Sequence, residues 1–147
     1  METIKDISMY LILSIVATVF CYWLESSFLF DYLQNNIIGL LITLLAINTA
    51  TSGLVASKMQ DLKLQKPQID LKEPIKQMKL SLVEQIILIA VSIIFMTILN
   101  SSLVNFDYKE HLFNGGLIFV LIYALAILMD TGKAVFTMIE GLQNIDK

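Results

Sequence analysis

Four long runs without a charged residue constrain the fold of this chain more than any other feature of its sequence. The runs cover residues 7–24, 32–57, 85–106 and 112–129. Each has at least the roughly 18 residues that a helix needs to cross about 30 Å of hydrocarbon. Apolar residues make up 56% of the chain and charged residues only 16%, whereas soluble proteins have roughly 45–50% and about 25%. We therefore predict an all-α membrane protein with four transmembrane helices in one domain, residues 1–147.

The lysines are distributed unevenly among the connections between the predicted spans, which we place at 7–24, 33–57, 84–104 and 112–130. The middle connection, 58–84, contains six of them: Lys58, Lys63, Lys66, Lys72, Lys76 and Lys79. The two other connections contain only Lys109. Because lysine is enriched in cytoplasmic loops, we expect both termini and the 58–84 connection in the cytoplasm. By analogy with small proteins of this type, the expected location is a bacterial inner membrane.

The two halves of the sequence resemble each other after a shift of 75 residues. The shift pairs Ser26-Ser27 with Ser101-Ser102, and one inserted residue then aligns Phe30-Asp31-Tyr32 with Phe106-Asp107-Tyr108. We interpret these matches as an internal repeat of two tandem, parallel helical hairpins, with chance similarity between biased sequences as the alternative. A parallel repeat differs from the inverted repeats of many transporters.

The 58–84 connection contains both prolines of the chain, Pro67 and Pro74. We expect the second helix to continue as far as Pro67, because proline breaks a helix interior. Asp70 and Glu73 have the spacing of a capping box at the start of the third helix. Helices two and three are therefore expected to extend into the cytoplasm as a hairpin. Its lysines either form a solvated face or bind anionic lipid or a partner protein. The candidate binding residues are Lys63, Lys66, Lys72, Lys76 and Lys79.

Small residues recur along one face of the second predicted span. At 100° per residue, one narrow stripe contains Gly39, Thr43, Ala46, Ala50, Gly53 and Ser57. Small residues at this spacing let membrane helices approach closely, so the stripe predicts a helix-packing face. In the fourth span, Gly115-Gly116 predicts either a helix break or another close approach.

Polar side chains within the spans supply candidates for a pore lining. Asn48, Thr51 and Ser52 lie on a second face of the second span, where the alternative for Asn48 is a hydrogen bond between helices. Asp130 and Lys133 share a face of the fourth helix. They form either an ordinary pair at the membrane interface or a functional pair inside a vestibule.

Residues that would carry catalysis are missing from the sequence. His111 is its one histidine and Cys21 its one cysteine, so a zinc site within one chain is implausible. No nucleophile motif or phosphate-binding glycine loop is present. We expect neither an enzyme nor a cofactor. A net charge of −3 and the absence of arginine also argue against nucleic-acid binding.

Two functions fit these features. The first is a channel-like or membrane-permeabilising subunit of a homo-oligomer, since four short helices enclose too little space for a selective pore alone. The second is a membrane anchor or sensor that recruits or regulates a cytoplasmic partner through the 58–84 hairpin, such as one in a bacterial stress or defence system. A dimeric small-solute transporter is a weaker third alternative, because the spans contain no pattern of discontinuous helices.

Overall fold

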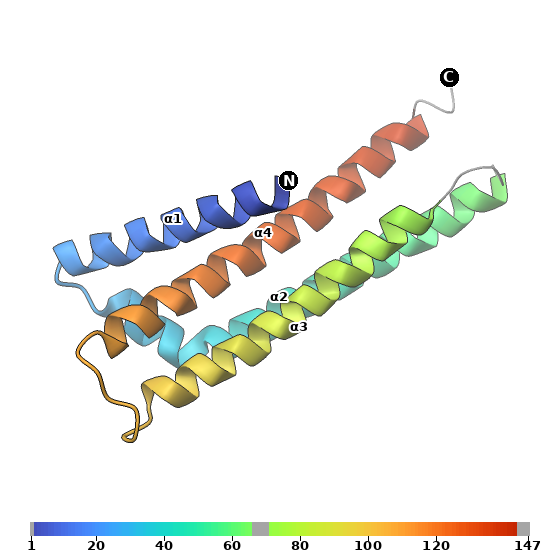
Figure 1. Ribbon diagram of the computed structural model, residues 1–147. Helices are drawn as coiled ribbons and strands as arrows, with labels where there is room; N and C mark the ends of the chain where they lie inside the picture. The colour runs from blue at the N-terminus through green and yellow to red at the C-terminus, as the bar shows by residue number, and fades with distance from the viewer. Residues whose placement is uncertain (1, 66–70, 144–147) are drawn as a thin grey trace.

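The structure is a computed structural model that describes the backbone of residues 2–65 and 71–143 and the side chains of 6–61, 63–64 and 71–136. Its four helices are α1 (Glu2–Trp23), α2 (Phe28–Gln65), α3 (Lys72–Leu99) and α4 (Lys109–Gln143) (Figure 1). All four are long and apolar enough to cross a membrane. The predicted all-α class with four candidate transmembrane helices is therefore confirmed.

Consecutive helices run in opposite directions along one bundle (Figure 1). At one end, which we call the lysine-rich end, α2 finishes and α3 begins near Lys58, Lys63, Lys72 and Lys76. At the other, the aromatic end, α1 connects to α2 and α3 connects to α4 among the side chains of Trp23, Phe28, Tyr32, Phe106 and Tyr108. Aromatic side chains of this kind are typical of a membrane–water interface.

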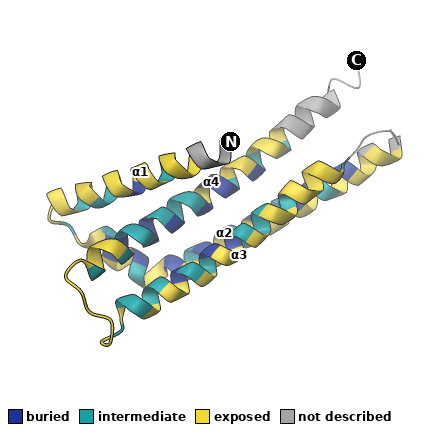
Figure 2. Ribbon diagram, in the orientation of Figure 1, coloured by how far each residue is buried: buried dark blue, intermediate teal, exposed yellow. Residues whose placement is uncertain are grey.

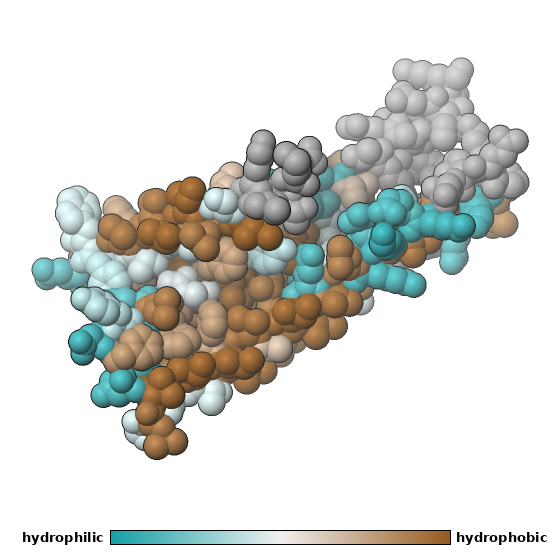
Figure 3. Space-filling model, in the orientation of Figure 1, coloured by the Kyte–Doolittle hydropathy of each residue, from teal (hydrophilic) through white to brown (hydrophobic). Residues whose placement is uncertain are grey.

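Helix α4 lies at the centre of the bundle and packs against α1, α2 and α3, while α2 also packs against α3. Leu33 and Ile37 of α2 and Leu117 and Val120 of α4 form the core and are at most 1% exposed. Most large apolar side chains of α1 are exposed (Figure 2). The apolar surface covers the middle of the bundle, with hydrophilic residues at both ends (Figure 3). This distribution suits a lipid environment, where exposed apolar side chains carry no cost.

The glycine pair in α4 marks a close approach of helices, one of the two predicted alternatives. The helix continues through both residues without a break. A Cβ atom on Gly116 would lie 2.5 Å from Cε2 of Phe95 on α3, and one on Gly115 would lie 3.3 Å from Oγ1 of Thr18 on α1. The two glycines therefore let neighbouring side chains pack directly on the α4 backbone.

Helix α2 ends at Gln65, just before Pro67, in agreement with the prediction that it continues beyond the apolar run. Its 38 residues correspond to about 57 Å, well beyond the roughly 30 Å of a hydrocarbon layer. Helix α3 begins at Lys72 with Leu71 as N-cap and without a side-chain capping hydrogen bond. Asp70, the first residue of the predicted capping box, lies outside the described residues.

The third helix ends at Leu99, short of the predicted limit at 104. The backbone N–H of Asn100 donates to the carbonyl of Met96, that of Ser101 donates to the carbonyl of Ile98, and the side-chain Nδ2 of Asn100 donates to Met96 as well. Asparagine and the two serines after it compete with helical hydrogen bonds, which ends α3 before the apolar run is finished. The arrangement of two tandem repeated hairpins remains a prediction, since α1 makes its main contacts with α4.

Candidate functional site

Of the polar residues predicted on α2, Asn48 lies at the contact between α2 and α3. Asn48 is fully buried, and its Nδ2 donates a hydrogen bond of 3.0 Å to Oε1 of Gln85 on α3. Ser52 is also buried, and Thr51 is half-buried. The structure therefore contains the interhelical hydrogen bond that the sequence offered as the alternative for Asn48.

The small-residue stripe of α2 faces outward. Gly39, Thr43, Ala46, Ala50, Gly53 and Ser57 are all exposed. A Cβ atom on Gly39 or Gly53 would meet no atom within 4 Å. The stripe thus lies on the outer surface of the described bundle, where lipid or another chain can reach it.

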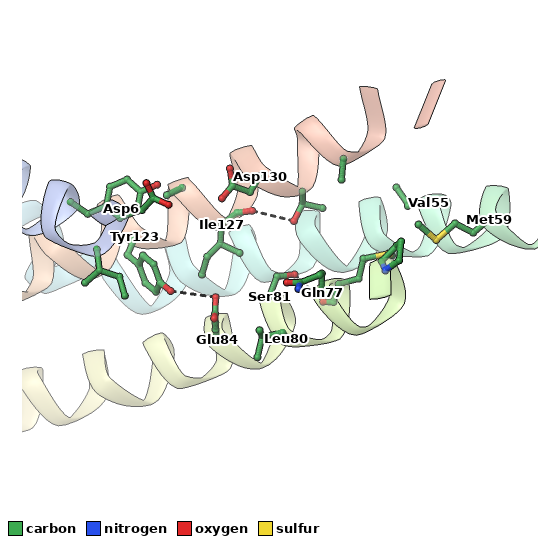
Figure 4. Close-up of a pocket in the computed structure, with 17 residues that line it drawn as sticks. Asp6, Val55, Met59, Gln77, Leu80, Ser81, Glu84, Tyr123, Ile127 and Asp130 are labelled. Carbon is green, nitrogen blue, oxygen red and sulfur yellow. Dashed lines mark hydrogen bonds between the residues drawn. The ribbon is translucent and has the colours of Figure 1, made fainter. Parts of the chain in front are cut away.

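A cavity of about 530 Å³ opens among all four helices toward the lysine-rich end (Figure 4). We call it the larger cavity. Three carboxylates from three helices line it: Asp6 of α1, Glu84 of α3 and Asp130 of α4. Among the described residues that line it there is no lysine. The walls between the carboxylates are mostly apolar and include Met59 and Ile127.

The predicted pair Asp130–Lys133 lies at the edge of the larger cavity. Nζ of Lys133 lies 3.1 Å from Oδ1 of Asp130, and both side chains are about 70% exposed. This exposure gives the ion pair little stabilising effect by itself. Asp130 nevertheless belongs to the cavity wall, so the structure contains features of both predicted alternatives.

Glu84 was missed as a candidate because it precedes the third apolar run and was assigned to the lysine-rich connection. In the structure it is half-buried within α3, and the hydroxyl of Tyr123 on α4 donates to its Oε2 at 3.4 Å (Figure 4). The ring of Tyr123 stacks on Phe119, with centroids 6.0 Å apart. The adjacent polar pair Glu84-Gln85 in a continuous helix was the available sequence signal.

A smaller cavity of about 420 Å³ lies at the aromatic end between α1, α2 and α4. Its carboxylates are Glu25, Asp31 and Glu110, and its lining residues also include no lysine. At its inner side, Nε2 of Gln34 donates a hydrogen bond of 2.8 Å to Oδ1 of Asn114. Glu25 has a φ of 50°, a conformation uncommon for residues other than glycine.

A mostly apolar segment of the core, which also contains the buried hydroxyls of Ser14 and Ser92, separates the two cavities. Along α4, the smaller cavity reaches Asn114 and the larger one begins at Tyr123, which are about 14 Å apart by helix rise. The core residues between them on α4 include Leu117 and Val120, and Ile37 of α2 packs in the same cluster. The side-chain hydrogen bonds of Asn114 and Tyr123 flank this segment of α4. In the described part of the chain, no side chain of residues 115–122 makes a hydrogen bond.

The lysines predicted to bind lipid or protein lie on exposed surfaces of the two helix extensions. Lys63, Lys72, Lys76 and Lys79 are exposed, and Lys66 lies outside the described residues. Lys76 pairs with Glu73 at 3.9 Å. Among the described side chains, no group of three or more His, Cys, Asp or Glu residues is close enough to hold a metal ion.

A scan against protein-family models found no matching family, and searches of curated proteins and of solved structures found no similar chain. The geometry of the two cavities and of the segment between them therefore carries the functional interpretation.

Proposed function

We propose that this protein is a channel-like subunit of a homo-oligomer that conducts cations across a membrane, and that the structure represents its closed state. The observation that supports this function best is the acidic cavity at each end of the bundle. In the described part of the chain, each is lined by three carboxylates and no lysine. The proposed activity requires no catalytic step and no cofactor.

Carboxylates in a recess with low-dielectric walls raise the local concentration of cations and repel anions. The mostly apolar segment between the cavities has the opposite effect, because an ion that enters it loses hydration and gains few polar partners. Hydrophobic constrictions of this kind gate channels by excluding water. Opening would therefore require separation of the core residues around Val120 so that water can connect the two cavities.

We place the lysine-rich end in the cytoplasm and the aromatic end outside, in a bacterial inner membrane, in accordance with the lysine distribution. If the hydrocarbon layer starts at Leu99, where α3 ends, Glu84 lies about 23 Å along the helix. This depth is within a layer of about 30 Å. Ionisable residues at membrane depth commonly face a water-filled cavity, which fits the position of Glu84 in the larger cavity. The extensions of α2 and α3 then project into the cytoplasm.

The flux of potassium through liposomes that contain the purified protein tests the role of Glu84. We expect Glu84→Gln to lower this flux about five- to tenfold, because a negative charge that attracts cations is lost. Glu73→Gln is the matched control: it makes the same change on the same helix, at an exposed residue outside the cavity lining. Equal flux in wild type and Glu84→Gln, with wild-type flux above that of empty liposomes, would show that Glu84 does not contribute to the cation pathway.

The outward small-residue stripe of α2 supports assembly into a homo-oligomer, because small residues allow close contact between membrane helices. We expect Ala50→Leu to lower the fraction of oligomer in mild detergent at least about fivefold, which corresponds to roughly 1 kcal/mol. Ala90→Leu adds the same bulk to an exposed position of α3 and should leave the mass distribution unchanged. Light scattering measures both, and an unchanged mass for Ala50→Leu would argue against this interface.

A second candidate function is a membrane anchor or sensor that recruits a cytoplasmic partner. The exposed lysines on the extensions of α2 and α3 support it. In this case, the combined replacement of Lys63, Lys66, Lys72 and Lys76 by glutamine should abolish recruitment, while membrane insertion stays intact. Co-purification from cells that express either form measures this directly, and recruitment by the variant at the wild-type level would contradict it.

A further inference from the structure

The larger cavity has apolar walls and aromatic side chains, which a bare inorganic ion does not require for binding. We propose that it binds hydrophobic organic cations, meaning molecules with a permanent positive charge on an apolar, aromatic body. This inference rests on the proposed cation pathway and names a class of ligand for the larger cavity. The inference rests on the cavity's walls, its aromatic side chains and its charges.

The volume and the walls of the cavity suit an organic molecule. A space of about 530 Å³ lies within the range of roughly 300–1,000 Å³ found for small-molecule sites, which are largely apolar with a few polar groups. Met59 of α2 and Met78 of α3 line it from opposite helices. Methionine side chains are flexible and polarisable, so they adapt to aromatic ligands of different shapes.

Two tyrosines provide aromatic surface next to the charge. The rings of Tyr10 and Tyr123 lie 6.0 Å apart at an angle of 49°, and both line the cavity. The faces of such rings attract cations. The hydroxyl of Tyr123 also orients the carboxylate of Glu84. A cation beside Glu84 would therefore contact both a negative charge and an aromatic face.

The charge of the cavity favours a cation. Asp6, Glu84 and Asp130 contribute three carboxylates, and Lys133, which pairs with Asp130, lies outside the described lining. The carboxylates come from three different helices, and no described group of acidic residues is compact enough to hold a metal ion. Dispersed carboxylates around apolar walls match a delocalised charge on a large body better than a small ion that needs several oxygen ligands.

Binding of radiolabelled tetraphenylphosphonium to the full-length protein in lipid nanodiscs tests the proposal, after subtraction of partition into empty nanodiscs. Tetraphenylborate has the same shape and the opposite charge, so it controls for hydrophobic binding alone. We expect saturable binding of the cation and none of the anion. Glu84→Gln should weaken binding about tenfold, whereas Glu73→Gln, which lies outside the cavity, should bind as wild type does.

Tyr10→Leu provides a second variant that retains every charge. It should also weaken binding of tetraphenylphosphonium, since an aromatic face is lost. Equal saturable binding of anion and cation, no saturable cation binding, or unchanged affinity in Glu84→Gln would overturn the proposal. Potassium flux is measured separately on the same preparations. Flux without tetraphenylphosphonium binding contradicts this inference alone, and binding without flux contradicts the cation pathway alone.

Discussion

Replacing Gly116 by leucine is expected to lower the midpoint of thermal unfolding by about 5–10 °C, which corresponds to roughly 1–3 kcal/mol of overpacking. A Cβ atom at this position would lie 2.5 Å from the ring of Phe95. That ring also packs against Phe113 of α4, with centroids 5.4 Å apart. The added side chain therefore requires the ring of Phe95 to move or α3 to shift away from α4.

Gly132→Leu is the matched control for this change because Gly132 lies on the same helix and a Cβ atom there meets nothing within 4 Å. Its unfolding midpoint should stay the same or rise, since leucine favours a helix more than glycine does. Both midpoints are measured in detergent by the loss of circular dichroism on heating. Equal effects of the two substitutions would contradict the close packing of α3 on α4.

The second large effect is expected in the apolar segment between the cavities. Val120 is 1% exposed within this core. Val120→Ser puts a hydroxyl group into the segment and makes a connected water path more favourable. We expect potassium flux through liposomes to increase about tenfold, equivalent to 1.4 kcal/mol on the free energy of opening.

Val83→Ser is the control for Val120→Ser, because it makes the same exchange at a position on α3 that is 51% exposed. Circular dichroism first establishes that both variants are folded. Wild-type flux in a folded Val120→Ser variant would exclude this segment as the gate. An equal increase in Val83→Ser would point to general leakiness of the protein instead.

Features that depend on local chemistry could be predicted from the sequence. The apolar runs identified four candidate spans, and α2 continues beyond its apolar run as predicted, as far as Gln65, while Pro67 lies outside the described residues. Gly115-Gly116 correctly indicated a close helix approach. The end of α3 was placed too late, because hydropathy does not register side-chain hydrogen bonds to the backbone: Asn100 donates to the carbonyl of Met96, and Oγ of Ser101 accepts from the N–H of Leu103.

The two cavities could not be predicted, because they depend on contacts between distant residues. Glu84 and Tyr123 are 39 positions apart, and Gln34 and Asn114 are 80 apart. Neither pair follows from helical periodicity within one segment. Asp130 was singled out because it stands beside an apolar run. Glu84, at the edge of another run, was not singled out, because the helix that partly covers it comes later in the chain.

The most direct test of the proposed cation pathway is the ion flux of the wild-type protein in liposomes, with potassium and chloride gradients imposed separately. We expect potassium flux above that of empty liposomes and a reversal potential near that of potassium, since both cavities are acidic. The same measurement on Val120→Ser ensures that a closed gate does not conceal the pathway. Vesicles that stay sealed in both forms, or a flux that prefers chloride, would contradict the proposal.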